Sequence, residues 1–320
     1  MVLSITLNPL LERNLFFKDL SQSSRAYKEF YSAGGKGINV SRQLNQLGIQ
    51  NHSLTLLGGN KGKIFRSILE KENINFSSIG TKSETREASL IFDEQNKNIK
   101  TYFGINSIIT DEEVSQFILK MEKAIVNSSI VVFSGSVPSE NCNQIIEKGL
   151  ELCNDLDKIS VLDTYGNNLE NLIKLGPTVI HNNSDELKKY LNSTLESAED
   201  YHEILNRFYR SGINLGFITN GKNPFYASKA DFHYKINNPE IEEINAIGSG
   251  DSFLSGIIYG LEKSLIFNDF VKLAAALGSL NAASLDVCKV KLENAIQFSQ
   301  NVSIQEIGKK IKIIDDSPTI

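Results

Sequence analysis

The chain has 320 residues, 41% of them hydrophobic and 22% charged, and its formal net charge is −5. This length allows one large buried core, and the interspersed acidic and basic residues argue against a nucleic-acid-binding or membrane-binding surface. The three cysteines form no CxxC pair, and no apolar run approaches the ~20 residues of a membrane span. We therefore expect a cytoplasmic protein without a disulfide framework or a zinc site.

The first predicted element is a buried strand over Val2–Thr6, a short, apolar and partly β-branched run. An Asn-Pro pair then breaks the strand, so Asn8 and Glu12 are expected near its carboxyl end, the edge at which open α/β sheets hold ligands. Asn14–Leu20 and Tyr27–Tyr31 are predicted as two further short strands with more polar residues. They could form a small layer outside the main sheet.

A glycine-rich stretch over Gly34–Gly37 leads into a predicted helix that ends at Gly48. Lys36 and Asn39 are expected to project from the start of this helix. Three glycines around one lysine cost conformational order unless the backbone must fit a ligand, such as a phosphate or a polyhydroxylated molecule. A tight turn between strand and helix is the alternative.

The next predicted strand, His52–Gly58, ends in a stretch rich in glycine and lysine that resembles a phosphate-binding P-loop only superficially. A P-loop needs a glycine at position 57, which is Leu57, and a Ser or Thr after Lys63, where Ile64 stands. The dinucleotide-binding fingerprint fails as well, because its third glycine is missing after both Gly-x-Gly stretches. The sequence therefore predicts neither nucleotide-binding signature.

A hairpin is predicted over Glu87–Asp93 and Ile99–Phe103, with Arg86 immediately before it. From Asp111 onward, predicted helices and strands alternate, which is typical of a largely parallel sheet wrapped by helices. The helices expected there cover 111–124, 140–153, 169–175, two segments up to 209, 270–283 and 292–302. The strands expected there cover 129–133, 159–162, 178–181 and 215–219.

Polar residues follow three of these strands. Ser136 follows the first, Asn183 and Glu186 follow the third, and Thr219 and Gly221 close the fourth. Asn183 and Glu186 share one face of a helix's opening turn, where a glutamate could hold a hydrated Mg²⁺. A helix-capping carboxylate is the alternative for Glu186. The four scattered histidines show no metal-ligand spacing and are expected to be structural.

The stretch around which the chain is organised is Ile244–Ser255, where an apolar segment leads through Gly248–Asp251 into an amphipathic helix. Glycines before a helix allow a ligand to approach closely, and the first-turn amides favour an anion. Asp251 beside such an anion hole suits phosphoryl transfer, because the carboxylate can accept the proton of an alcohol. A glycine-rich turn capped by an aspartate is the alternative.

Taken together, four motifs resemble those of the ribokinase-like PfkB carbohydrate kinases, specifically the 1-phosphofructokinase and tagatose-6-phosphate kinase branch. Thr6–Pro9 resembles the branch's TLNP, Gly34–Val40 its GGKGINV, Ser134–Pro138 its SGSxP and Asn245–Ser252 its NxxGxGDS. The spacing from Arg25 to Gly34 also resembles that of the branch's phosphate-binding arginine. The resemblance covers nearly the full chain.

The resemblance implies one doubly wound α/β domain over residues 1–320, with a small β lid formed by residues 12–33 and 86–106. It also implies ATP and Mg²⁺ as cosubstrates and a homodimer formed through the lid. Asp251 matches the base that deprotonates the sugar hydroxyl, and the backbone of Gly248, Ser249 and Gly250 matches the anion hole.

Further contacts follow from the resemblance alone. Substrate contacts are implied for Glu12, Arg25, Gly35, Lys36, Asn39, Arg86 and Ser136. Nucleotide contacts are implied for Asn183, Thr219, Gly221, Gly248, Gly250 and Asn281, and a magnesium-side contact is implied for Glu186.

Three departures from the family's pattern are present. Glu12 stands where an aspartate usually grips sugar hydroxyls, and it is one methylene longer. His181-Asn182-Asn183 replaces the usual Lys-Pro-Asn, and Thr219-Asn220-Gly221 replaces Ser-x-Gly. The first departure bears on the identity of the sugar, and the other two lie on the nucleotide side.

The leading hypothesis is transfer of the γ-phosphoryl group of ATP to a hydroxyl of an already phosphorylated ketohexose, tagatose 6-phosphate or fructose 1-phosphate, to give a bisphosphate. Lys36, Arg25 and Arg86 favour a phosphorylated substrate, because a neutral sugar would not need three cations. The alternative is a catalytically silent sensor of sugar phosphate or nucleotide on the same fold.

Overall fold

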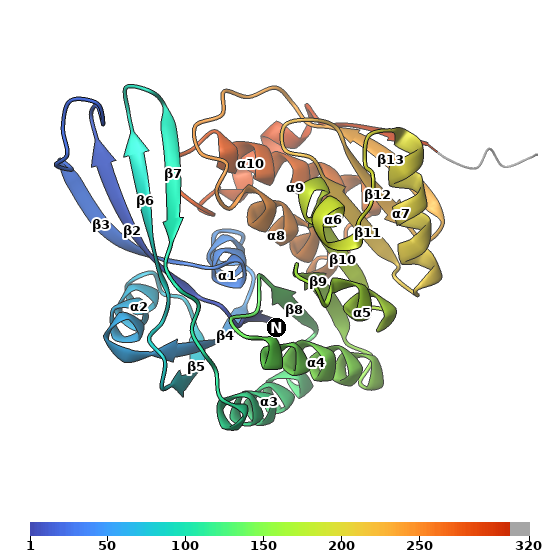
Figure 1. The fold of residues 1–320 in the computed structure, drawn as a ribbon. Helices are drawn as coiled ribbons and strands as arrows, with labels where there is room; N and C mark the ends of the chain where they lie inside the picture. The colour runs from blue at the N-terminus through green and yellow to red at the C-terminus, as the bar shows by residue number, and fades with distance from the viewer. Residues whose placement is uncertain (308–320) are drawn as a thin grey trace, which may run out of the picture.

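The computed structural model describes residues 1–307, which form two β-sheets with helices packed around the larger one (Figure 1). The larger sheet has ten strands in the order β14-β13-β12-β11-β10-β9-β8-β1-β4-β5. From β11 to β5 all neighbours pair in parallel, whereas β12, β13 and β14 extend one edge in antiparallel pairing. The strands are β1 (Val2–Thr6), β4 (Asn51–Gly58), β5 (Phe76–Thr81), β8 (Ile130–Ser134), β9 (Ile159–Asp163), β10 (Val179–Asn183), β11 (Leu215–Thr219), β12 (Phe225–Lys229), β13 (Phe232–Asn237) and β14 (Ser303–Glu306).

Helices cover both faces of this sheet, as the alternation along β1 shows. Val2 belongs to an apolar cluster with α1, α8, α9 and α10, whereas Leu3 belongs to a second cluster with α3 to α7. The predicted doubly wound α/β architecture is therefore confirmed. The helices are α1 (Lys36–Gln46), α2 (Gly59–Lys71), α3 (Asp111–Val126), α4 (Asn143–Asp155), α5 (Leu169–Lys174), α6 (Ser184–Leu191), α7 (Ala198–Arg210), α8 (Ser249–Glu262), α9 (Phe267–Ala282) and α10 (Leu292–Ser299), with a short 3₁₀ turn over Glu140–Cys142. Within residues 1–307, no helix is both long and apolar enough to cross a membrane.

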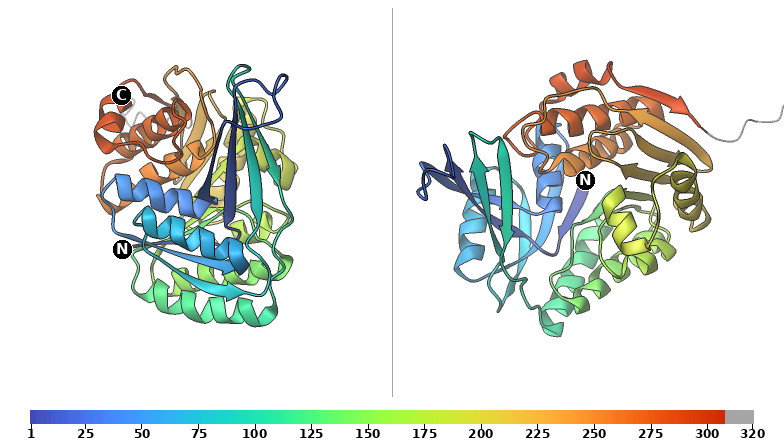
Figure 2. Two further views of the ribbon diagram at one scale, coloured as in Figure 1. Left: turned by 90° about the vertical axis from the view of Figure 1, so that its left-hand side faces the viewer. Right: turned by 45° about the horizontal axis from the view of Figure 1, so that its top comes forward.

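The small sheet stands apart from the large one and has four strands in the order β3-β2-β6-β7 (Figures 1 and 2). These strands are β2 (Leu10–Phe17), β3 (Lys28–Gly34), β6 (Glu87–Asp93) and β7 (Asn98–Phe103). β2 lies between β3, with which it pairs in antiparallel, and β6, with which it pairs in parallel. The ranges predicted for a lid, 12–33 and 86–106, contain most of these residues, and the function of the sheet as a lid stays a prediction.

Several elements were missing from the sequence-based expectation. The helix α2, the strand β5 and the antiparallel strands β12, β13 and β14 are observed but were not predicted. The helix predicted to continue to residue 302 ends at Ser299, and the chain then forms the edge strand β14. Such an edge strand depends on pairing with a distant strand, here β13, and not on its own four residues.

The glycine-rich stretch that fails the P-loop pattern begins the helix α2. The carboxylate of Glu84 accepts hydrogen bonds from the backbone N–H groups of Asn60, at 2.9 Å, and Lys61, at 3.3 Å. A carboxylate of the chain itself thus satisfies the amides that a phosphate would bind. The structure agrees with the rejection of a P-loop at this position.

Candidate active site

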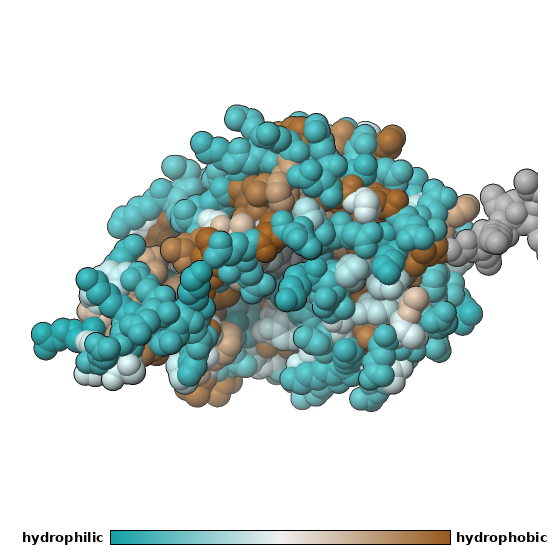
Figure 3. Space-filling model, turned by 90° about the horizontal axis from the view of Figure 1, so that it is seen from above, coloured by the Kyte–Doolittle hydropathy of each residue, from teal (hydrophilic) through white to brown (hydrophobic). Residues whose placement is uncertain are grey.

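The carboxyl ends of five parallel strands, β1, β8, β9, β10 and β11, meet at one edge of the large sheet. The order of strands reverses at β1, because β4 lies on one side of it and β8 on the other. Open α/β sheets hold their ligands in the crevice at such a reversal. Seen from above, the molecule is hollowed between the small sheet and the helices of the large sheet (Figure 3).

Asp251 lies in this crevice, in the first turn of α8. Its side chain is buried, and its Oδ2 accepts a hydrogen bond of 2.8 Å from Nδ2 of Asn39 at the start of α1. The pKa of Asp251 is raised from its ordinary value of 3.8 to about 7, mainly by burial. The negative charge of Asp163 also raises this pKa, and its effect is larger than the opposite effect of the positive charge of Lys36. The structure therefore supplies a carboxylate whose proton affinity suits a general base.

The backbone before Asp251 has a conformation that requires glycine. Gly248 has a φ of +77° and forms the N-cap of α8, and a Cβ atom on it would lie 2.5 Å from Cγ1 of Val287. Ser249 and Gly250 open the first turn of α8, where backbone N–H groups have no intrahelical partner, and the N–H of Ser249 donates to the carbonyl of Ala246 at 3.2 Å. This geometry is compatible with the predicted anion hole beside a carboxylate, and the role of these residues stays a prediction.

Asn281, for which a contact with adenine was predicted, is fully buried behind the anion hole. Its Nδ2 donates to the carbonyl of Ile247 at 2.8 Å and to Oγ of Ser249 at 3.1 Å, while its Oδ1 accepts from the backbone N–H of Cys288 at 2.7 Å. With both ends of its amide bonded inside the protein, Asn281 holds the loop before α8 in place. The predicted contact with adenine is untested, and the position favours this supporting role instead.

The orientation of Asn39 is fixed by a second buried residue, Arg42. Nη1 of Arg42 donates to Oδ1 of Asn39 at 2.7 Å, and Nη2 of Arg42 lies 2.9 Å from Oε2 of Glu72. Because a guanidinium only donates, Oδ1 of Asn39 must face it, and Nδ2 then faces Asp251. The sequence analysis identified Asn39 but missed Arg42 and Glu72, since an arginine at a helix surface carries no signal of burial.

Lys36 lies between two carboxylates. Its Nζ is 3.2 Å from Oδ1 of Asp163 and 3.0 Å from Oε1 of Glu186. Burial alone would lower the pKa of Lys36, but the negative charges of Asp163 and Glu186 raise this pKa above its usual range. The predicted contact of Lys36 with the sugar phosphate is untested, and the structure places the ammonium toward the side of Glu186.

Asp163, which the sequence analysis missed, is the fully buried centre of this network. It accepts hydrogen bonds from Lys36 and from Oγ of Ser134, the latter at 2.5 Å, and its Oδ1 lies 3.0 Å from Nδ1 of His181. Burial raises its pKa, but Lys36 and His181 lower it by more, so Asp163 stays ionised. A signal was present, because Asp163 is the first polar residue after the apolar strand predicted over 159–162.

His181 connects this network to the end of β11, where nucleotide contacts were predicted. Its Nδ1 faces Asp163, and its Nε2 lies 3.2 Å from Oγ1 of Thr219. A Cβ atom on Gly250 would lie 3.4 Å from Cε1 of His181, so the ring lies directly against the anion hole. The histidine that departs from the family's usual lysine is thus close to the predicted site of phosphoryl transfer.

Glu186 and Asn183 form a capping box at the start of α6. Oδ1 of Asn183 accepts from the backbone N–H of Glu186 at 2.8 Å, and Oε2 of Glu186 accepts from the backbone N–H of Asn183 at 3.1 Å. The capping alternative for Glu186 is therefore present in the structure. Its other oxygen, Oε1, faces Lys36. Within residues 1–307, no group of three or more His, Cys, Asp or Glu residues could hold a metal ion.

Asn8, after the end of β1, joins Arg86 to Ser136, and the substrate contacts implied for these two residues stay predictions. Nη2 of Arg86 donates to the carbonyl of Asn8 at 3.1 Å, and Nη1 donates to Oδ1 of Asn106 at 3.2 Å. Nδ2 of Asn8 donates to Oγ of Ser136 at 3.0 Å. This polar cluster joins the base of the small sheet to the large sheet.

Glu12 is buried on β2, with Oε2 accepting a hydrogen bond of 2.8 Å from Oγ of Ser32. Burial raises the pKa of Glu12, although Ser32 and nearby Arg42 and Arg86 act in the opposite direction. A Cβ atom on Gly34 would lie only 2.1 Å from Oε1 of Glu12. The absence of a side chain at Gly34 therefore makes room for the longer carboxylate.

Three other predicted site residues lie in turns. Gly35 has a φ of +108° and forms the N-cap of α1. Gly221, whose carbonyl accepts from Asn238 at 3.3 Å, follows β11. Arg25 is exposed in the turn between β2 and β3, away from Lys36 and Asn39, so its predicted contact with a phosphate is untested.

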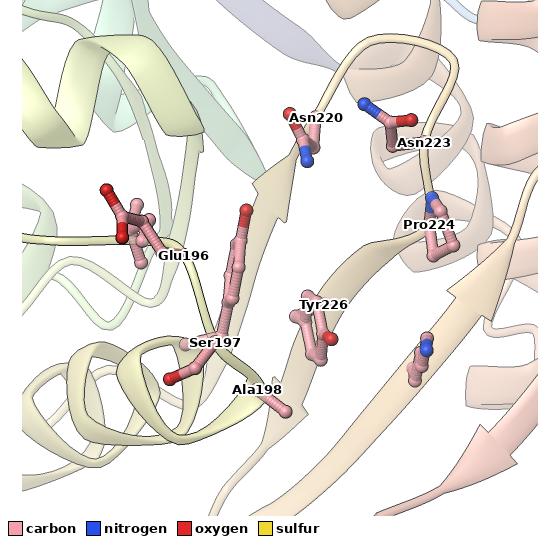
Figure 4. Close-up of a pocket in the computed structure, with 10 residues that line it drawn as sticks. Glu196, Ser197, Ala198, Asn220, Asn223, Pro224 and Tyr226 are labelled. Atoms are coloured by element: carbon pink, nitrogen blue, oxygen red, sulfur yellow. The ribbon is translucent and has the colours of Figure 1, made fainter.

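A pocket of about 200 Å³ lies beside the turn after β11, between that turn and the segment before α7 (Figure 4). Asn220, Tyr226 and Ser197 are among the residues that line it. Apart from Asn220, the motifs described above contribute nothing to this lining, so the pocket is separate from the crevice that holds Asp251.

The chain was compared with known families and structures. Residues 3–294 match the model of the pfkB family of carbohydrate kinases. A possible 1-phosphofructokinase from Thermotoga maritima is similar at 24% identity over 96% of this chain and 100% of that one, with a TM-score of 0.85. Phosphofructokinase-2 from Escherichia coli, solved with potassium, is similar at 20% identity over 93% of this chain and 98% of that one, with a TM-score of 0.83. The chain therefore belongs to the pfkB family of carbohydrate kinases, and the predicted enzyme class, an ATP-dependent phosphotransferase with an alcohol acceptor, is confirmed.

Proposed function

We propose that the enzyme transfers the γ-phosphoryl group of ATP to a hydroxyl of a phosphorylated ketohexose and so produces a bisphosphate. The observation that carries this proposal is the carboxylate of Asp251, buried beside the N-terminus of α8 and held by Asn39 at 2.8 Å. Burial raises the pKa of Asp251 to about 7, close to the value at which a general base works best at neutral pH.

In the proposed reaction, Asp251 accepts the proton of the sugar hydroxyl as the hydroxyl oxygen bonds to the γ-phosphorus. The bond from that phosphorus to the bridging oxygen of ADP breaks, and ADP leaves with the electron pair. The first-turn amides of α8, from Gly250 onward, and the dipole of that helix stabilise the negative charge on the transferred group. In-line positioning and electrostatic stabilisation supply most of the catalysis in such a transfer.

A hydrated Mg²⁺ fits the residues near Glu186. Oε1 of Glu186 and Oδ1 of Asp163 both contact the ammonium group of Lys36, so a Mg²⁺ ion would meet these carboxylates through its waters, beside that ammonium and not in its place. Mg²⁺ prefers such oxygen ligands and keeps several waters, which suits a site with few protein carboxylates. When bound there with ATP, the ion would neutralise charge on the phosphates, and Lys36 would add a second positive charge beside them.

The phosphate already present on the sugar is proposed to bind near Arg86. Its guanidinium group lies at the base of the small sheet, next to Asn8 and Ser136. Its Nε–H is buried and has no hydrogen-bond partner among residues 1–307, so a phosphate that reaches the guanidinium would satisfy a donor that these residues leave unbonded. The structure of Escherichia coli phosphofructokinase-2 with fructose-6-phosphate, a similar fold at 20% identity, supports a substrate of this class.

The small sheet is proposed to act as a lid and to carry a homodimer interface. Exposed aromatic side chains gather on two of its strands, with Phe30 43% and Tyr31 38% exposed on β3 and Tyr102 58% and Phe103 63% exposed on β7. Aromatic surface of this kind is typical of protein interfaces. Sedimentation of the purified chain over a range of concentrations tests this proposal, and a strictly monomeric protein would contradict it.

The substrate proposal is tested by measuring ADP release in a coupled assay. The panel contains tagatose 6-phosphate, fructose 1-phosphate, fructose 6-phosphate and the two corresponding unphosphorylated sugars, tagatose and fructose, each with and without Mg²⁺. We expect sugar-dependent ADP release with at least one of the phosphorylated ketohexoses and little with the unphosphorylated sugars. A preference for an unphosphorylated sugar would refute the substrate class, and release unaffected by chelation of Mg²⁺ would refute the metal requirement.

A further inference from the structure

Ile247 lies directly before the glycines of the anion hole, in the segment between β13 and α8. Its half-buried side chain packs against the apolar core of the small sheet and not against the helices around the large sheet. That core consists of Leu10, Phe16, Ala88, Leu90 and Phe92. The segment before α8 therefore contacts the small sheet through Ile247, and Figure 1 shows how α8 and the small sheet are arranged.

The backbone of Ile247 is fixed from the opposite side. Its carbonyl accepts a hydrogen bond of 2.8 Å from Nδ2 of Asn281, and its N–H donates to Oδ1 of Asn245 at 3.1 Å. The carbonyl of Ile247 and the N–H of Gly248 belong to one planar peptide unit, so a rotation of either moves the other. The position of Ile247 thus determines how the chain enters the left-handed conformation of Gly248, which has a φ of +77°.

An ion pair between Lys97 and Glu242 at 3.0 Å also joins this segment to the small sheet. Both side chains are largely exposed, at 83% and 79%, and an exposed pair of this kind contributes little to the preference for one arrangement. The apolar contact of the half-buried Ile247 removes hydrocarbon surface from water and involves no charges that salt could screen. It is therefore the stronger connection between the small sheet and the anion hole.

We propose that Ile247 is a positioning residue through which the small sheet sets the geometry of the anion hole over Gly248–Asp251. The proposal rests on the proposed function, in which this hole stabilises the transferred phosphoryl group. Truncation of Ile247 leaves the hydrogen bonds to Asn245 and Asn281 available but removes the contact with the sheet. A displacement of about 1 Å in a reacting group can cost ~10²-fold in rate, so the loss is expected in kcat.

The test compares Ile247→Ala with Ile99→Ala, a matched truncation on β7 of a half-buried residue that packs on the same apolar core. With the best substrate from the panel, we expect Ile247→Ala to lower kcat roughly 10- to 100-fold with little change in the KM for ATP. Ile99→Ala should have a similar Tm and a kcat near that of the wild type, and Ile247→Val should restore most of the lost kcat. Equal kcat values for the two alanine variants at equal Tm would overturn the proposal.

A second measurement is independent of activity. Hydrogen exchange of the amides of residues 248–251 in the full chain without substrates is expected to be faster in Ile247→Ala than in the wild type and in Ile99→Ala. If no sugar in the panel releases ADP, the proposed function fails and the exchange experiment still tests the connection. Equal exchange rates in all three proteins would refute the positioning role even in an active enzyme.

Discussion

The side-chain amide of Asn39 donates a hydrogen bond of 2.8 Å to the buried carboxylate of Asp251, although the two residues are 212 positions apart. The bond joins α1, which follows the first glycine-rich stretch, to α8, which follows the second. The donor is a neutral amide and not a cation, so the pKa of Asp251, raised by burial, stays near 7. In the proposed reaction, this bond would hold the substrate-side groups at the start of α1 next to the base on α8.

Asp251→Asn is expected to lower kcat by ~10²–10⁴-fold, the usual contribution of a general base, while ATP binding is retained. The amide of the variant has nearly the shape of the carboxylate but cannot accept the proton of an alcohol. Steady-state kinetics and a direct titration with ATP would measure the two effects. Normal turnover by the variant would show that Asp251 is not the base.

The kcat/KM of the wild type is expected to fall as the pH drops below about 7, because Asp251 then carries the proton that it must accept. The stability of the folded state changes with pH in the opposite direction from kcat/KM. The folded state raises the pKa of Asp251 from 3.8 to about 7, so it binds the proton more tightly than the unfolded chain, and the contribution to stability is lost as the pH rises through this range. The Tm of Asp251→Asn should therefore exceed that of the wild type at pH 8. A lower Tm at pH 8 would contradict the raised pKa.

Asp163→Asn is expected to shift the midpoint of the pH–rate profile to lower pH. Burial is the main reason for the raised pKa of Asp251, and the negative charge of Asp163 is the second, so removal of that charge leaves the ionised base less disfavoured. Asp200→Asn is a suitable control, because Asp200 is a capping residue at the start of α7, outside the crevice. An unchanged midpoint in Asp163→Asn would mean that burial alone sets the pKa.

The alternation of strands and helices and the positions of most site residues could be predicted from the sequence, because both depend on local patterns. Ser136 and Thr219 lie at the carboxyl ends of β8 and β11, and parallel pairing brings such ends to one edge. Asp163 follows the same rule and was overlooked. Asp251 could be predicted for a different local reason, because it follows the glycines that begin α8. The paired strands β12 and β13 were also missed, since antiparallel pairing at the edge of a mostly parallel sheet depends on contacts between distant segments.

The roles of Arg42 and Asn281 could not be read from the sequence. Arg42 is 5% exposed and Asn281 is fully buried because other segments pack over them, and a single sequence does not show that packing. The partners of Lys36 are likewise 127 and 150 positions away. Motif spacing identifies which residues gather at the crevice, but it does not say which of their atoms are already bonded within the protein.

Arg42→Lys is expected to lower kcat as well as stability, because an ammonium group cannot bond Glu72 and Oδ1 of Asn39 in the two-pronged geometry of a guanidinium. The amide of Asn39 then loses the partner that fixes its orientation toward Asp251. Loss of one such buried bond to a charged group costs about 1.5–3 kcal/mol of the free energy of unfolding. Denaturant unfolding and steady-state kinetics would measure the two effects.

The matched control for this variant is Arg13→Lys. Arg13 pairs with Glu29 at 2.8 Å, but both side chains are 41% exposed. An exposed pair contributes roughly 0–1 kcal/mol, so this control should unfold nearly as the wild type does and keep its activity. Similar stability losses in both variants would contradict the special role of the buried arginine.

Gly34→Ala is expected to raise the KM for the sugar phosphate, because the new Cβ atom would lie 2.1 Å from Oε1 of Glu12 and must displace the carboxylate. Glu12→Asp shortens that side chain by one methylene, so the double variant should bind the sugar phosphate better than Gly34→Ala alone. Gly80→Ala is the control, since a Cβ atom there would meet nothing within 4 Å. The contact between positions 34 and 12 is tested by measuring the KM for the sugar phosphate and for ATP in Gly34→Ala, Glu12→Asp, the double variant and Gly80→Ala. If the double variant binds no better than Gly34→Ala, the carboxylate of Glu12 is not what requires glycine at position 34, and its longer side chain must be accommodated elsewhere in the crevice.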